Sequence, residues 1–228
     1  MHADISAIST WVFDLDNTLY PPQVRLFDQI EERMRHFMAE ALNITHEDAD
    51  LLRADYWARY GTTLAGLMAE HALPPEGFLK DVHEIDFSVL QDDPGLRAAI
   101  ETLPGRKIIY TNGTAPYAAQ VSKACGLDGL FDAIYGVEHA GFVPKPRAEA
   151  FDRVFGKDGL HGPSSIMFED EARNLEVPFH SGLRTVHVAP RAVAHDYISH
   201  HTSDLVEFLE QIVAQGFPTT GVQNTSEI

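Results

Sequence analysis

Short apolar runs recur along this chain, and a loop or a segment long enough for a helix separates each run from the next. Buried strands of a parallel sheet have this character, and the alternation with helical segments is typical of a sheet covered by helices on both faces. We therefore expect an α/β fold with a Rossmann-like parallel sheet and right-handed crossovers. The expected strands are 11–13, 107–111, 132–136, 164–168 and 184–188.

One long segment interrupts this alternation. Apolar residues after Pro21 fall at spacings of three to five, with no convincing strand, so they predict helices instead. Prolines at 21–22 and the stretch Asp92-Asp93-Pro94-Gly95 suit hinges at its two ends. We expect a Rossmann-like core from 1–20 and 93–213, an inserted all-helical cap over 21–92, and a flexible tail over 214–228.

Composition restricts the classes of function. The 228 residues carry a net charge of −17, which repels nucleic acid polymers and anionic membrane surfaces. Small phosphorylated molecules stay open as substrates, because a local cation can reverse the potential inside one cleft. Cys125 is the only cysteine, no apolar stretch approaches a membrane span, and no export signal is visible. We expect a cytoplasmic protein that binds neither membrane nor nucleic acid; its oligomeric state is left open.

Two carboxylates end the first apolar run, in the stretch WVFDLDNTLYPP. Asp14 and Asp16 lie two residues apart, so in extended backbone they share a face and point toward the crevice where α/β proteins bind ligands. Burial of two like charges is unfavourable unless a cation or a shared proton relieves it. The ordinary alternative is that one aspartate caps a turn and the other is exposed.

Three further features follow in chain order. Thr111-Asn112-Gly113 ends the second strand with a hydroxyl and free backbone N–H groups, which suit an anion, although Asn-Gly is also a common turn. Lys145 stands between two prolines and is either a phosphate ligand or a surface lysine. Glu169 and Asp170 repeat the pattern of a strand followed by acids, and by itself this pair could simply begin a helix.

Taken in order, these four features resemble the haloacid dehalogenase superfamily of phosphatases, over roughly residues 10–210. FDLDNTLYPP and the insertion with YGTTLAGL resemble its pyrimidine 5′-nucleotidase branch. The resemblance implies that Asp14 is the nucleophile and forms an aspartyl-phosphate, whereas Asp16 is the general acid and base. It implies Mg²⁺ as cofactor, held by Asp14, the backbone carbonyl of Asp16, and Asp170.

The resemblance also implies phosphoryl contacts from Thr111, the backbone N–H of Asn112, and Lys145. Many relatives have aspartate where this chain has Glu169, so contact of Glu169 with the metal, direct or through water, stays open. Asn174 is expected to orient metal-bound water.

The expected activity is Mg²⁺-dependent hydrolysis of a small phosphomonoester, most specifically a pyrimidine nucleoside 5′-monophosphate. Tyr60, Thr62 and Thr63 interrupt the helical pattern of the insertion, so they form either a loop that faces the substrate or a tight turn. Three alternatives share features of the chain: a sugar-phosphate or phosphoglycolate-type phosphatase, a haloalkanoate dehalogenase, and a non-catalytic phosphate-binding module. Asp16 argues against the dehalogenase, which needs no acid at that position.

Overall fold

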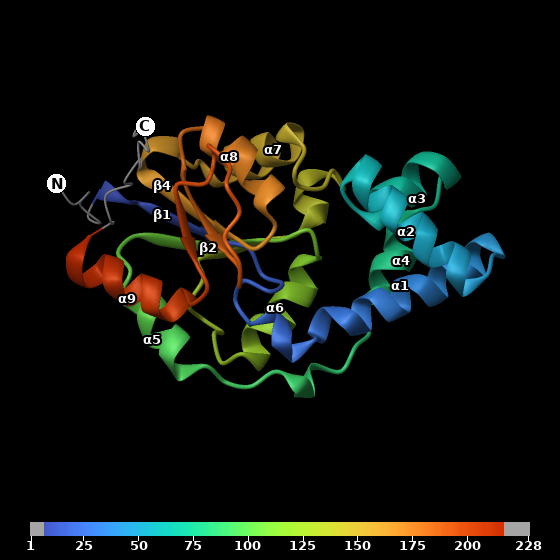
Figure 1. Ribbon diagram of the computed structural model, residues 1–228, viewed down its shortest axis with the longest axis horizontal. Helices are drawn as coiled ribbons and strands as arrows, with labels where there is room; N and C mark the ends of the chain where they lie inside the picture. The colour runs from blue at the N-terminus through green and yellow to red at the C-terminus, as the bar shows by residue number, and fades with distance from the viewer. Residues whose placement is uncertain (1–6, 217–228) are drawn as a thin grey trace, which may run out of the picture.

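A computed structural model describes residues 7–216, which contain a parallel sheet of six strands (Figure 1). The order is β3-β2-β1-β4-β5-β6, and every neighbouring pair is parallel. This arrangement confirms the predicted Rossmann-like parallel sheet, with the first strand in its interior. The strands are β1 Thr10–Phe13, β2 Arg106–Tyr110, β3 Ala133–Tyr135, β4 Ser165–Glu169, β5 Arg184–Val188 and β6 His200–Thr202.

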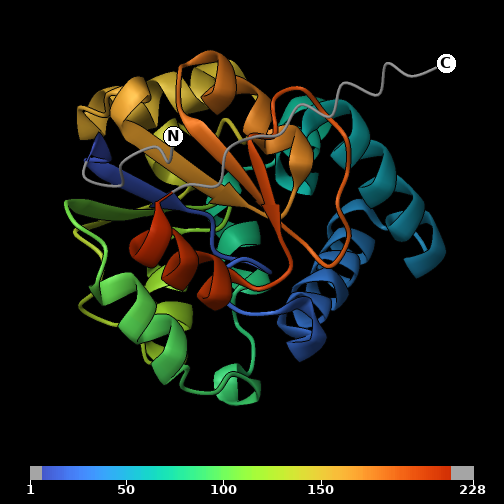
Figure 2. The same cartoon turned by 60° about the vertical axis from the view of Figure 1, so that its left-hand side comes forward.

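Strand residues alternate between two apolar layers, one on each face of the sheet. In β1, Trp11 and Phe13 pack on one face and Val12 on the other, and all three are fully buried. Figure 2 shows the two helical layers with the sheet between them. Helices α5 Pro94–Glu101, α6 Ala115–Ala124 and α9 Leu205–Gln215 cover the first face, and α7 Ala148–Asp158 and α8 Glu176–His180 cover the second.

Four of the five α-helices between β1 and β2 form a separate body beside the sheet (Figure 1). They are α1 Leu26–Leu42, α2 His46–Tyr60, α3 Thr63–His71 and α4 Pro75–Val82. No strand occurs among them, as the apolar spacing predicts. Short 3-10 helices also occur in the described residues, at Pro22–Val24, Phe87–Val89, Val137–Ala140, Gly162–Ser164 and Ala172–Leu175.

Two local features differ from the sequence predictions. The short strand β6 was not predicted, because its three residues are polar and only half-buried and so have no apolar run. The predicted tail begins too early, since α9 continues through Gln215 and ends at Gly216; the rest of that tail lies outside the described residues. No helix within 7–216 is long and apolar enough to cross a membrane.

The inserted body depends on one close approach between two of its helices. Gly66 of α3 faces the ring of Tyr56 on α2, and a Cβ at Gly66 would lie 2.2 Å from the Tyr56 ring. Tyr56 is fully buried, so its ring has little room to move. The glycine therefore allows the two helices to pack.

We expect Gly66→Ala to lower the free energy of unfolding by about 1–3 kcal/mol, the usual cost of overpacking. Gly77→Ala is the matched control, because Gly77 is also helical but a Cβ there meets nothing within 4 Å. That control should be neutral or stabilising, by up to about 1 kcal/mol. Urea denaturation of both variants gives the comparison, and equal stabilities would refute the packing argument.

Candidate active site

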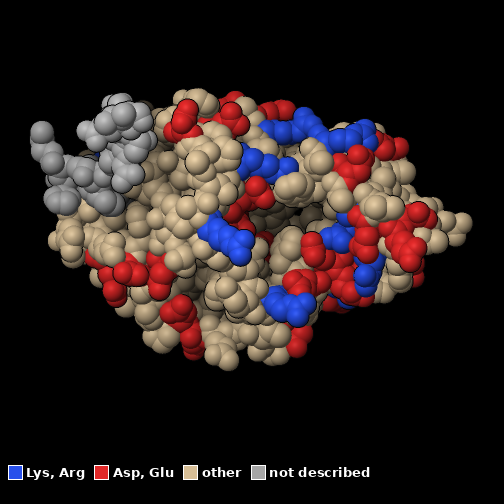
Figure 3. Space-filling view, in the orientation of Figure 1, with Lys and Arg blue, Asp and Glu red and all other residues tan. Residues whose placement is uncertain are grey.

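The predicted site residues of the core meet at one edge of the sheet. The loops after β1, β2 and β4 lie side by side, because these parallel strands are neighbours and end on the same side. A cavity of about 700 Å³ opens there, between the sheet and the inserted helices. Figure 3 shows the corresponding hollow, with acidic and basic side chains around it. Its lining includes Asp14, Asp16, Thr111, Asn112, Lys145, Glu169, Asp170 and Asn174.

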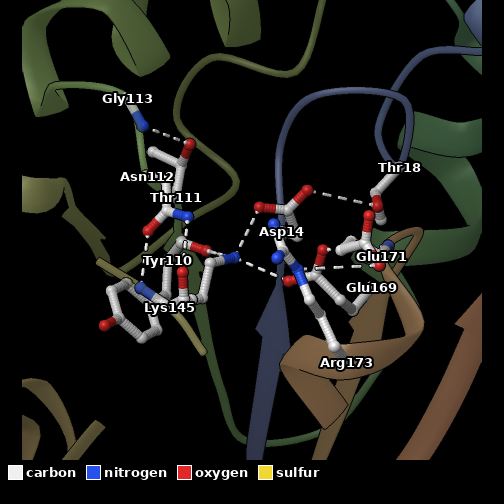
Figure 4. A network of polar contacts seen from close by, with 10 residues as sticks. All are labelled: Asp14, Thr18, Tyr110, Thr111, Asn112, Gly113, Lys145, Glu169, Glu171 and Arg173. Carbon is white, nitrogen blue, oxygen red and sulfur yellow. Dashed lines mark hydrogen bonds and ion pairs between the residues drawn. The ribbon is translucent and has the colours of Figure 1, made fainter. Parts of the chain in front are cut away.

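Lys145 lies at the centre of this cluster, as Figure 4 shows. Its ammonium donates to Asp14 Oδ1 at 2.7 Å, to Glu169 Oε2 at 2.6 Å and to the carbonyl of Tyr110 at 3.0 Å. Only 1% of the Lys145 side chain is exposed. Because an ammonium has three donors, all are engaged here, and a phosphoryl oxygen would have to replace one of these partners.

The surrounding charges shift the proton affinities of the site. Burial alone would lower the pKa of Lys145, but Asp14 and Glu169 raise it above that of a free lysine, so Lys145 stays charged. Burial, with the nearby charge of Glu169, raises the pKa of Asp14 to about 7. The same causes raise the pKa of Asp170 to about 9. Burial and the charge of Asp14 raise the pKa of Asp16 to about 6. The single positive charge of Lys145 therefore does not offset the negative charge of the carboxylates around it.

The acidic cluster fits a divalent cation. Oxygens of Asp14, Glu169 and Asp170 lie within 4.8 Å of one another, and hard cations prefer such oxygen ligands. Oδ1 of Asn174 is buried in the wall of the same cavity without a hydrogen-bond partner. An ion with its bound water would offset the charge and give this oxygen a donor. Lys145 already donates to one oxygen of Asp14 and to one oxygen of Glu169, so an ion would share these two carboxylates with the lysine.

Thr111 and Asn112, which both follow β2, make different contacts near Lys145. Thr111 is buried and its Oγ1 accepts the N–H of Gly113 at 2.9 Å, which leaves its own hydrogen for a ligand in the cavity. The Asn112 side chain binds the backbone of Lys145 twice, accepting its N–H at 2.8 Å and donating to its carbonyl at 3.1 Å. The amide of Asn112 thus holds the lysine in place, a contact that the sequence did not predict.

The inserted helices form the opposite wall. Thr62 and Thr63 line the cavity, at the tight turn between α2 and α3. Tyr60 does not: its hydroxyl donates to Glu70 at 2.8 Å on another part of the inserted body. The lining residues that the sequence analysis missed include six that α1 and α2 present at helical spacing: Phe27, Glu31, Met34, Asp50, Arg53 and Trp57.

Arg173 connects the two walls. Its guanidinium lies 3.6 Å from the centre of the Trp57 ring and donates to the carbonyls of Trp57 and Gly61, at 3.1 Å and 3.2 Å. Arg173 follows β4, whereas its partners belong to the inserted helices. This contact joins the inserted helices to the core beside the cavity, which all three residues line.

This chain belongs to the family of haloacid dehalogenase-like hydrolases, whose pattern its residues 8–177 match. The prediction that the chain is an enzyme of the hydrolase class is confirmed. A curated relative, phosphate metabolism protein 8 of Saccharomyces cerevisiae, is 24% identical over 181 residues. The match covers 72% of this chain and 56% of the yeast protein, so the chain spans little more than half of that relative.

Solved structures of similar fold come from several kinds of protein. A phosphatase from Thermococcus onnurineus has a TM-score of 0.63 at 16% identity, covering 92% of this chain and 99% of its own. YfnB of Bacillus subtilis, bound to magnesium, has a TM-score of 0.60 at 19% identity, covering 90% and 98%. L-2-haloacid dehalogenase of Xanthobacter autotrophicus has a TM-score of 0.61 at 17% identity, covering 92% and 100%. These likenesses establish the fold, and phosphatases and dehalogenases share it.

Proposed function

We propose that this hydrolase cleaves phosphomonoesters through an aspartyl-phosphate on Asp14. The observation that carries the proposal is the pair at the end of β1: Asp14 lies against Lys145 in the acidic cluster, and Asp16 lines the same cavity. A nucleophile and a separate acid are what phosphoryl transfer to a side chain requires. The phosphatase from Thermococcus onnurineus and the yeast phosphate metabolism protein support the same class.

The reaction would occur in two steps. Asp14 attacks phosphorus as the bond to the leaving oxygen breaks, and Asp16 gives its proton to that oxygen. A water molecule then attacks phosphorus and loses its proton to Asp16, which releases phosphate and frees Asp14. Thr111, with its free hydroxyl hydrogen, binds a phosphoryl oxygen. Lys145 offsets the charge of Asp14, and its ammonium exchanges one of its three hydrogen-bond acceptors for a phosphoryl oxygen.

We infer that Mg²⁺ is the cation of the acidic cluster, held by Asp14, Asp170 and the carbonyl of Asp16. The raised pKa of Asp14 and of Asp170 and the unpaired Oδ1 of Asn174 support a cation there, and the magnesium-bound YfnB shares the fold. When bound, the ion supplies positive charge for the phosphoryl oxygens.

We further propose a pyrimidine nucleoside 5′-monophosphate as substrate, with residues 21–92 acting as a cap that closes over it. The cap wall combines apolar faces, from Phe27, Met34 and Trp57, with the charged groups of Arg53 and Glu31, which lie 2.9 Å apart. Such a wall suits a flat ring with a polar edge better than a bare sugar. A larger purine would hold the cap open.

Initial rates across a panel of phosphomonoesters test this assignment. We expect kcat/KM for UMP and CMP to exceed that for AMP, GMP, sugar phosphates and phosphoglycolate, with no release of halide from a 2-haloacid. Thr63→Val and Arg53→Met should reduce the pyrimidine preference roughly threefold to tenfold, the effect of one lost hydrogen bond. Tyr60→Phe is the control outside the cavity. Faster hydrolysis of purine or sugar phosphates would refute the nucleotidase assignment and leave the phosphatase assignment standing.

A further inference from the structure

Two tyrosines hold the carboxyl group of Asp16. The hydroxyl of Tyr20 donates to Asp16 Oδ1 at 2.7 Å, and the hydroxyl of Tyr117 donates to the same oxygen at 2.6 Å. Both rings are buried, with 4% and 1% of their surface exposed. Neither tyrosine lines the cavity, so these residues approach Asp16 from behind the active site.

The two tyrosines come from separate parts of the chain. Tyr20 follows Asp16 by four residues, whereas Tyr117 belongs to α6 and lies 101 residues away in sequence. Gly113 makes room for the second ring: a Cβ at Gly113 would lie 2.8 Å from Tyr117 Cδ1. The His83 ring stacks on Tyr117, with centres 4.3 Å apart and planes inclined by 10°. The close approach of Gly113 and the stacking of His83 both restrict the Tyr117 ring.

Two donors on one oxygen make the carboxyl group unsymmetrical. Oδ1 receives both phenol hydrogens, and Oδ2 receives no hydrogen bond from residues 7–216. A carboxylate oxygen has about two acceptor positions, so a proton on Asp16 belongs on Oδ2. Rotation about the Asp16 side chain would break both hydrogen bonds at once. The orientation of the acidic oxygen is thus set before substrate binds.

We propose that Tyr20 and Tyr117 are positioning residues that dedicate Oδ2 of Asp16 to proton transfer. This inference rests on the proposed phosphatase function. In the first step Oδ2 gives its proton to the leaving oxygen as the bond from that oxygen to phosphorus breaks. In the second step Oδ2 takes a proton from the attacking water. Oδ1 keeps its two phenol hydrogens throughout.

A purely structural role predicts different behaviour. Buried phenol groups need a hydrogen-bond partner, and Asp16 could serve only as that partner. Loss of a phenol would then lower stability and slow all substrates alike. Loss of positioning instead slows the substrates whose leaving oxygen needs a proton, because an activated aryl oxygen leaves as an anion without help.

The test is the dependence of kcat/KM on leaving-group acidity, measured with a series from dinitrophenyl phosphate to phenyl phosphate and UMP. This constant reports formation of the aspartyl-phosphate, so slow hydrolysis of that intermediate does not obscure it. Tyr20→Phe, Tyr117→Phe and the double variant are compared with Tyr135→Phe. Tyr135 also donates to a buried carboxylate, Asp158 at 2.9 Å, away from the cavity.

We expect each single variant to steepen the dependence of kcat/KM on leaving-group acidity. The double variant should lower kcat/KM for UMP and phenyl phosphate roughly tenfold or more, which is part of the usual contribution of general acid catalysis. Dinitrophenyl phosphate should change less than about threefold. Tyr135→Phe should keep the dependence of the wild type. If the tyrosine variants keep the wild-type dependence on leaving-group acidity, or slow every substrate by the same factor, the positioning role is overturned and the phosphatase function still stands. A wild type that hydrolyses none of the series would overturn the phosphatase function and this inference together.

Discussion

Asp14→Asn should lose turnover by roughly 10⁴-fold or more, the scale seen when a nucleophile is removed from a catalytic unit. Asparagine has nearly the same size as aspartate, but its amide does not attack phosphorus. The fold should persist, because Lys145 keeps Glu169 and the Tyr110 carbonyl as partners. Steady-state rates with an aryl phosphate, together with a thermal melt, separate the two effects.

Asp158→Asn is the matched control for this substitution. Asp158 is also a buried carboxylate paired with a cation, since Arg106 donates to it at 2.7 Å, but it lies outside the cavity. We expect Asp158→Asn to lose stability and to retain kcat. A folded Asp14→Asn enzyme with near-normal turnover would exclude Asp14 as nucleophile.

Removal of the metal should have the second large effect, on both stability and activity. Burial raises the pKa of Asp14 to about 7 and that of Asp170 to about 9, above the usual value of 3.8. Between pH 7 and 9 the metal-free folded state therefore binds more protons than the unfolded state, and stability falls as pH rises. The half-buried His83 and His200, whose pKa values burial lowers to about 4, act in the opposite sense only below pH 6.5.

In excess chelator, we expect the free energy of unfolding to fall by about 1 kcal/mol or more between pH 7 and 9. Mg²⁺ at 100 times its Kd should raise Tm by roughly 5–10 °C and restore hydrolysis, because it binds only the folded state. Asp170→Asn should show a smaller pH dependence and a smaller response to Mg²⁺. Identical melting and full activity with chelator and with Mg²⁺ would contradict a metal site in this cluster.

The sheet and the core side of the site could be predicted from the sequence because both follow from strand ends. Apolar runs mark the strands, and parallel neighbours bring the residues after Phe13, Tyr110 and Phe168 to one edge. The strand β6 could not be found this way, since its residues His200–Thr202 are polar. Its position depends on pairing with β5, a long-range contact that the local pattern does not contain.

The partners of the site residues were less predictable than the residues themselves. The contact between Tyr117 and Asp16 joins positions 101 residues apart and has no motif of its own. Most of the wall formed by the inserted helices was also missed, because the choice of Tyr60 rested on a break in the helical pattern; of the residues chosen there, Thr62 and Thr63 line the cavity. The register of α2 instead turns Arg53 and Trp57 toward the cavity.

The most direct test of the account is capture of the phosphoryl group on Asp14. The enzyme is mixed with an excess of dinitrophenyl phosphate and Mg²⁺, quenched in acid within a turnover, digested and examined by mass spectrometry. We predict one phosphoryl group on the peptide that contains Asp14, its loss after treatment with hydroxylamine, and none in Asp14→Asn. Turnover with no modified Asp14 at any quench time would show direct attack by water and contradict the central claim.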